Sequence, residues 1–176
     1  MKLFVYGSLL NPFSAEQALR RPITVADLLP ARLPGYRLCW DSLHLVHVDS
    51  LGHATLAAFL NIRPDPTGQC LGALLELNDE ELYRLKAREK GYSLIPVQCQ
   101  GIDTRPCAAN TFMDERRPSP PLPPVLAAYL DKIRAGLAHF EPEFARAYLS
   151  ELPLPTAPLL PGNYHFVDSE QRANTC

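Results

Sequence analysis

The chain has 176 residues, a length that fits one compact domain. Hydrophobic residues make up 47% of it and charged residues 20%, a balance that supports a buried core and excludes a disordered chain. The formal net charge is −2 and no long basic run occurs, so the composition gives no reason to expect a nucleic-acid partner.

The chain begins MKLFVYGSLL, where one lysine precedes an apolar stretch that Gly7 and then Asn11-Pro12 interrupt. A signal peptide needs a longer apolar region and a cleavage site of small residues. No apolar run approaches the roughly 18 residues of a membrane span. We therefore expect a cytoplasmic protein with no membrane partner.

Short apolar or alternating runs, separated by turn signals, predict the strands. They cover residues 2–6, 36–40, 44–48, 54–62, 70–77, 92–99 and 107–113. The clusters at 49–52 (DSLG) and 65–68 (DPTG) are typical of turns, so each is expected to separate two strands.

Capping residues and apolar stripes predict the helices. They cover a short segment after Asn11-Pro12 and residues 78–89, 124–138 and 142–151. Ser14 with Gln17 is a possible capping box for the first helix. Asn78 with Glu81 is expected to cap the start of the second.

This order of elements differs from the strand–helix alternation of a doubly wound sheet. It predicts an α+β protein with a largely antiparallel sheet or barrel and helices packed outside. Residues 118–124 (PSPPLPP) and 153–162 are proline-rich connectors. The first could dock a groove that binds proline-rich peptides, but a stiff linker is the favoured interpretation.

The cysteine and histidine spacings give no metal site. Cysteines stand at positions 39, 70, 99, 107 and 176, without a C-x-x-C pair. A zinc site or a disulfide framework would show tighter spacing, so we expect reduced thiols without metal. His44 and His47 would lie on opposite faces of a strand, which disfavours a shared metal.

The segment Tyr6-Gly7-Ser8-Leu9 directly follows the first predicted strand. A glycine turn there can direct consecutive backbone N–H groups to one side, and such a concavity binds a carboxylate or a developing oxyanion. An ordinary glycine at a strand end is the alternative interpretation.

Glu89 is placed at the C-terminus of the helix predicted over 78–89, between Arg88 and Lys90. The helix dipole disfavours a carboxylate at that end, so a functional role is one interpretation. A solvated glutamate beside two basic neighbours is the other. Tyr129 lies on the apolar stripe of the helix over 124–138, which fits a core tyrosine as well as a site residue.

Taken together, these segments resemble the gamma-glutamylcyclotransferase superfamily, with its AIG2-like and ChaC-like branches. The matching segments, in the order of the family, are 6–9 (YGSL), 35–38 (GYRL), 70–74 (CLGAL), 89–92 (EKGY), 118–120 (PSP), 129–130 (YL) and 133–136 (IRAG). The resemblance implies a small, mostly antiparallel β-barrel of about six strands with outer helices. We expect this domain to cover residues 1–152, with 153–176 as a proline-rich C-terminal extension.

The resemblance also implies the roles of the candidate residues. Glu89 is the implied catalytic acid/base. The implied substrate-binding residues are Val5, Tyr6, Gly7, Ser8, Leu9 and Tyr129.

The implied reaction is the cyclisation of a small gamma-glutamyl amine, peptide or amino acid to 5-oxoproline, with release of the free amine. The reaction needs no cofactor or metal, because nucleophile and electrophile belong to one molecule and the enzyme mainly orients them. Two alternatives stay open. One is a non-catalytic binding or interaction protein of the same fold, and the other is an unrelated antiparallel domain that docks a partner through its proline-rich connector.

Overall fold

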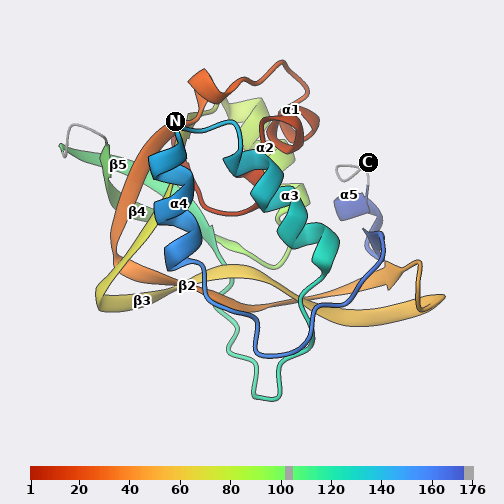
Figure 1. The fold of residues 1–176 in the computed structure, drawn as a ribbon. Helices are drawn as coiled ribbons and strands as arrows, with labels where there is room; N and C mark the ends of the chain where they lie inside the picture. The colour runs from red at the N-terminus through yellow and green to blue at the C-terminus, as the bar shows by residue number, and fades with distance from the viewer. Residues whose placement is uncertain (102–104, 173–176) are drawn as a thin grey trace.

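Five strands close into a barrel and a sixth extends it in the computed structural model, which describes residues 1–101 and 105–172 (Figure 1). The described strands are β1 (Lys2–Val5), β2 (Leu29–Val48), β3 (His53–Glu76), β4 (Ser93–Gly101), β5 (Pro106–Met113) and β6 (Tyr164–Phe166). Their order is β3-β1-β5-β4-β2-β6, and β2 pairs with β3 to close the ring. Every pairing is antiparallel except that of β1 with β5. The predicted α+β barrel is confirmed.

Two long strands replace four of the predicted short ones. The runs 36–40 and 44–48 both belong to β2, and 54–62 and 70–77 belong to β3. The turn at 49–52 is confirmed, since it joins β2 to β3.

The predicted strand break at 65–68 is wrong, because the chain bulges there and then resumes the same ladder. The register passes from Tyr36↔Pro64 to Pro34↔Gln69, so residues 65–68 lie opposite a single glycine. The Thr67 N–H donates to Asp65 Oδ1 at 3.1 Å. This bond gives the Thr67 N–H a partner within the bulge, so the strand can continue beyond it.

The first four described helices lie close to their predicted positions, whereas the fifth was not predicted. The described helices are α1 (Pro12–Leu19), α2 (Asp79–Arg88), α3 (Ala127–Leu137), α4 (Pro142–Glu151) and α5 (Ser169–Arg172), with 3₁₀ turns at Ser8–Leu10 and Val25–Asp27. The Asn78–Glu81 capping box is confirmed, with bonds of 2.9 and 2.8 Å. The Ser14–Gln17 box is wrong: Asn11 Oδ1 caps α1 by accepting from the Phe13 N–H at 3.0 Å. No described helix is long and apolar enough to cross a membrane.

Strand β1 lies in the core and carries the chain to the turn at Ser8–Leu10. Its residues Leu3, Phe4 and Val5 are at most 3% exposed. Helix α4 is tied to the end of this strand, because the hydroxyl of the buried Tyr148 donates to the Tyr6 carbonyl. The turn is thereby fixed between the barrel and the helices (Figure 1).

The C-terminal segment returns to the barrel beyond α4. Leu160 exchanges backbone hydrogen bonds with Val125 and Ala127, and β6 pairs with the end of β2. The Lys90 ammonium forms ion pairs with Asp168 at 2.7 Å and Glu170 at 3.4 Å. The segment therefore packs against the loop that follows α2. The division of the chain at 152/153 stays a prediction.

Thiol titration tests the expected reduced state of the cysteines. Cys39, Cys70 and Cys99 are free and buried, and Cys107 is free and partly exposed, whereas Cys176 lies outside the described residues. Burial raises the pKa of Cys70 and of Cys99 to about 12, so few thiolates form there at neutral pH. Among these four, we expect Cys107 to react first in the native protein. Five thiols should react after unfolding without reductant, and fewer than five would contradict the expectation.

Candidate active site

All seven residues predicted for the site line one cavity. Its volume is about 390 Å³, including the space at its mouth. The lining includes Val5, Tyr6, Gly7, Ser8 and Leu9 from the end of β1 and the turn, with Glu89 and Tyr129 from the helices. Segments about 80 to 120 residues apart in the sequence therefore meet here, because the barrel and its helices close around the turn.

The turn after β1 leaves two backbone donors at this cavity. The Leu10 N–H donates to the Gly7 carbonyl at 3.0 Å, and the Asn11 N–H donates to the Ser8 carbonyl at 3.1 Å. Within the described part of the chain, the amides of Ser8 and Leu9 make no hydrogen bond. A carboxylate or an oxyanion in the cavity could accept from these amides.

Tyr129 lies directly against the turn. A Cβ added to Gly7 would stand 3.1 Å from the Tyr129 hydroxyl oxygen, so the glycine gives the tyrosine its space. The Tyr129 ring packs edge-on against Phe59 and Trp40 at centroid distances of 4.8 and 6.3 Å. Burial raises the pKa of Tyr129, so its hydroxyl remains protonated at neutral pH and can donate a hydrogen bond.

Glu89 stands at the C-terminal cap of α2. Its N–H donates to the Leu85 carbonyl at 2.7 Å, and its carbonyl accepts from the Tyr92 N–H at 3.0 Å. Gly91 has a φ of +95°, a left-handed conformation that turns the chain towards β4. The helix cap and this turn fix the backbone on both sides of Glu89. They therefore also fix the direction in which the Glu89 side chain leaves the backbone.

The Glu89 carboxylate is sheltered: its side chain is 21% exposed, and Oε1 lies 3.5 Å from Arg88 Nε. Burial raises the pKa of Glu89 above its ordinary value of 4.5, and the charge of Arg88 lowers it by a smaller amount. The interpretation as a fully solvated surface glutamate does not fit this environment. A carboxyl with a raised pKa is suited to accept a proton and return it near neutral pH.

Arg88 and Tyr92 also belong to the site, although the sequence analysis did not assign them to it. Arg88 Nη2 donates to Ser8 Oγ at 3.2 Å, so this arginine joins the turn to Glu89. The Tyr92 hydroxyl donates to the Leu60 carbonyl at 3.0 Å across the barrel. Both residues flank Glu89 in the sequence, and that proximity was the available signal.

A second cavity adjoins the first at Glu89. It shares Ser8, Glu89, Tyr92 and Tyr129 with the first, and its volume is about 440 Å³ including its open side. Its other lining residues include the cations Arg88 and Lys132 and the aromatic residues Phe59, Tyr164 and Phe166. Tyr164 and Phe166 come from β6, which no sequence motif had indicated.

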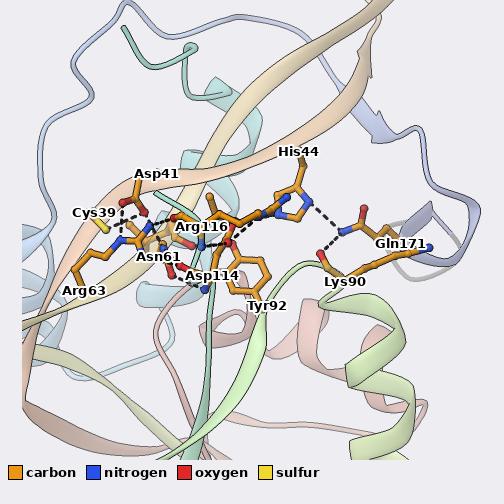
Figure 2. Close-up of polar contacts among 12 residues, drawn as sticks. Cys39, Asp41, His44, Asn61, Arg63, Lys90, Tyr92, Asp114, Arg116 and Gln171 are labelled. Carbon is orange, nitrogen blue, oxygen red and sulfur yellow. Dashed lines mark hydrogen bonds and ion pairs between the residues drawn. The ribbon is translucent and has the colours of Figure 1, made fainter. Parts of the chain in front are cut away.

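A chain of polar contacts supports the wall of the second cavity (Figure 2). Gln171 Nε2 lies 3.3 Å from His44 Nδ1 and also contacts the carbonyls of Arg88 and Lys90 at 3.4 and 3.5 Å. Burial lowers the pKa of His44 to about 4, so the ring is neutral at pH 7. The other ring nitrogen of His44, Nε2, lies 3.0 Å from Ser42 Oγ. These contacts hold α5 against residues 88–90.

The same chain of contacts continues from Ser42 into an ionic cluster around the buried Asp114 (Figure 2). Asp114 accepts from Ser42 Oγ at 2.8 Å and from the Arg116 guanidinium at 2.6 and 2.8 Å. Burial alone would raise the pKa of Asp114, but these hydrogen bonds lower it below its usual range. Arg63 pairs with Asp41 at 2.7 Å and also donates to the Asp114 carbonyl. The cluster fixes β2 and β3 to the segment after β5.

The predicted separation of His44 from His47 is confirmed. His44 is buried among aromatic rings, and His47 stacks on His165 with centroids 5.1 Å apart. In the part of the chain that the structure describes, no group of three or more His, Cys, Asp or Glu side chains could hold a metal ion.

The comparison with known families agrees with the geometry. The family described as gamma-glutamyl cyclotransferase, AIG2-like, matches residues 3–128. The chain belongs to this family. The match includes the turn after β1 and Glu89, and it ends just before Tyr129. No curated protein matched the chain in sequence.

Solved structures share the gamma-glutamyl cyclotransferase fold at low sequence identity. One named gamma-glutamyl cyclotransferase has a TM-score of 0.63 at 16% identity, over 90% of this chain and 92% of its own. An uncharacterized protein from Homo sapiens has a TM-score of 0.61 at 17% identity, over 90% and 92%. A gamma-glutamyl cyclotransferase specific to glutathione from yeast has 0.58 at 14% identity, over 86% and 95%. At these identities the likeness shows the fold alone.

The raised pKa of Glu89 predicts a pH-dependent cost in stability. Below the ordinary value of 4.5 the carboxyl is neutral whether the protein is folded or unfolded. As pH rises from 4.5 towards the raised pKa of the folded state, the carboxyl ionises in the unfolded chain but stays neutral in the native site. The native protein therefore loses stability over this range of pH. The melting temperature of Glu89→Gln minus that of the wild type should therefore increase with pH across this window. A difference independent of pH would show that the carboxyl is not desolvated.

Proposed function

We propose that the protein is a gamma-glutamyl cyclotransferase that converts a small gamma-glutamyl compound to 5-oxoproline and a free amine. One observation carries this proposal: a sheltered carboxyl with a raised pKa, Glu89, shares a cavity with the unbonded amides of Ser8 and Leu9. An acid/base and an oxyanion-binding turn are the two parts that this cyclisation requires.

The reaction uses Glu89 twice. Its carboxylate takes a proton from the substrate α-ammonium, and the freed amine attacks the γ-carbonyl carbon to form the new C–N bond. Negative charge develops on the carbonyl oxygen, where the turn amides can stabilise it. The bond to the leaving nitrogen then breaks as Glu89 returns the proton to that nitrogen. The attacking nitrogen, which still carries two protons, gives one of them to the released amine, so the products are 5-oxoproline and an ammonium. Atoms balance without water, since one substrate gives 5-oxoproline and one amine.

The shape of the cavity supports an orientation effect. An extended gamma-glutamyl chain keeps its amine away from its γ-carbonyl, so the enzyme must hold the folded conformer. Phe4, Leu60 and Phe112 give this cavity apolar walls. Such walls favour a folded, compact ligand over an extended, hydrated one. The Tyr129 hydroxyl lies beside the turn as a further donor to the substrate.

Release of 5-oxoproline by the purified protein tests the proposal. Gamma-glutamylalanine, gamma-glutamylethylamide and glutathione should be supplied separately and the product measured by chromatography, because the leaving amine is not fixed by the fold. Product from any of them supports the enzyme. Binding of these compounds without any release would instead support a non-catalytic binding protein of the same fold.

A further inference from the structure

A single side chain contacts the backbone on both sides of Glu89. The amide nitrogen of Gln171, Nε2, lies 3.4 Å from the Arg88 carbonyl oxygen and 3.5 Å from the Lys90 carbonyl oxygen. The Arg88 carbonyl belongs to the last turn of α2, where carbonyl groups have no partner within the helix. Gln171 is only 7% exposed, so the C-terminal segment supplies a buried donor to this end of the helix.

Asp168 holds α5 next to the same backbone. Its Oδ1 accepts from the N–H groups of Glu170 and Gln171 at 3.0 and 3.4 Å, so this carboxylate caps the start of the helix. Its Oδ2 accepts from Lys90 Nζ at 2.7 Å. One carboxylate thus fixes the turn of chain that carries Gln171 and joins it to the residue that follows Glu89.

A directional chain of hydrogen bonds extends from Gln171 to the buried Asp114 (Figure 2). An amide nitrogen only donates, so the contact of 3.3 Å makes His44 Nδ1 an acceptor. Burial lowers the pKa of His44 to about 4, so the neutral ring carries its proton on Nε2 and donates to Ser42 Oγ. The Ser42 hydroxyl in turn donates to Asp114 Oδ2 at 2.8 Å. Each bond has one donor and one acceptor, and the chain anchors Gln171 to the interior of the protein.

The ring of His44 also packs against the residues that follow Glu89. It stacks on Tyr92, with centroids 5.6 Å apart and planes 13° apart. A Cβ at Gly91 would lie 3.5 Å from His44 Cε1, so the ring lies close to the backbone there. The loop after Glu89 is therefore held by the same ring that accepts from α5.

The C-terminal segment also lines the cavity that contains Glu89. Tyr164 and Phe166 reach the second cavity from β6, and Gln171 reaches it from α5. All three residues lie beyond the 3–128 span that matches the family. Part of the environment that shelters Glu89 therefore comes from outside the matched span.

We propose that Gln171 is a positioning residue for Glu89, which fixes the backbone on each side of the glutamate and keeps the C-terminal wall of the second cavity in place. The inference rests on the proposed function and assigns part of its geometry to the C-terminal segment. Gln171 acts through the carbonyls of Arg88 and Lys90 rather than on the substrate. Loss of its donors should let this backbone shift and let water reach Glu89, and even a small displacement of a catalytic group slows a reaction.

The pKa of Glu89 in Gln171→Met tests the inference without turnover. Methionine keeps the length of the side chain but donates no hydrogen bond. The Glu89 carboxyl can be followed by ¹³C NMR in protein labelled at glutamate, and Glu89→Gln identifies its resonance. In the wild type it should titrate above its ordinary value of 4.5, and in Gln171→Met its pKa should fall towards that value as water enters. Gln98→Met, the same change at an exposed position of β4 outside both cavities, should leave this pKa unchanged.

Turnover gives a second measurement. With a gamma-glutamyl compound that the protein converts, kcat of Gln171→Met should fall by roughly 10- to 100-fold, the effect of a displaced catalytic group. KM should change less, because the turn and the apolar walls of the first cavity come from other elements. Gln98→Met should keep both constants.

A purely structural Gln171 gives a different pattern. Gln171→Met would then melt at a lower temperature but, below its melting transition, would keep the Glu89 pKa and the kcat of the wild type, and this result would overturn the inference. If no gamma-glutamyl compound is converted, the proposed function fails, and the titration of Glu89 alone decides whether Gln171 positions it. If Gln171→Met does not fold, Gln171→Asn replaces it. Its amide is one methylene shorter and should not reach both carbonyls, so the Glu89 pKa should fall here too, and an unchanged value overturns the inference.

Discussion

Replacing Glu89 with glutamine is expected to slow the release of 5-oxoproline by roughly 10²–10⁴-fold, the usual contribution of a positioned general base. Glutamine keeps the size of the side chain, but its amide cannot accept the α-ammonium proton. Substrate binding should largely survive, because under the proposed function the amides of Ser8 and Leu9 hold the substrate independently of the carboxylate.

The stability of Glu89→Gln should change little at neutral pH. The substitution removes a desolvated carboxylate, which is favourable, but it also removes the anion 3.5 Å from Arg88. Glu80→Gln is the matched control, since Glu80 lies in the first turn of the same helix and outside both cavities. Near-normal turnover by Glu89→Gln on a confirmed substrate would remove Glu89 from the mechanism.

Replacing Gly72 with alanine is expected to be the most destabilising of the changes considered. A Cβ at this position would overlap the carbonyl oxygen of Val5 and lie 2.6 Å from Phe4 Cζ. The clash with Val5 involves backbone, which a side-chain rotation cannot relieve. We expect a loss of about 1–3 kcal/mol in the free energy of unfolding, typical of overpacking a core, measured by denaturant titration.

The same substitution should also impair the site, because Val5 leads directly into the turn that lines the cavity. Gly52→Ala is the control. Gly52 has a φ of +69° in the β2–β3 turn, and a Cβ there would meet nothing within 4 Å. It should lose some stability through backbone strain but retain activity. Unchanged stability in Gly72→Ala would contradict the close approach of β1 to β3.

The fold could be predicted from the sequence wherever local patterns decide it. The Asn78–Glu81 cap and the turn at 49–52 were both found because a few adjacent residues specify them. The continuity of β2 and β3 could not be found in this way. Pro34 and Pro64 read as strand breakers, yet both flank the bulge, where the ladder is already interrupted and a missing N–H costs little. The parallel pairing of β1 with β5 joins segments about a hundred residues apart, and no local pattern encodes it.

The candidate site also has a part that local sequence patterns predicted and a part that they did not. The turn after β1 and Glu89 were predicted because ordered motifs carried them. The wall formed by Tyr164 and Phe166 was missed, since these residues reach the cavity only through the pairing of β6 with β2. Arg88 was named only as a basic neighbour of Glu89, and its burial became evident from the structure. Long-range closure of the barrel therefore determines this part of the candidate site.

The fate of solvent oxygen tests the central claim most directly. Gamma-glutamylalanine should be incubated with the protein in water enriched in ¹⁸O, and the products analysed by mass spectrometry. Intramolecular cyclisation at the Glu89 site predicts unlabelled 5-oxoproline and alanine in equal amounts. Labelled glutamate, which forms only when water attacks the γ-carbonyl, would contradict the account.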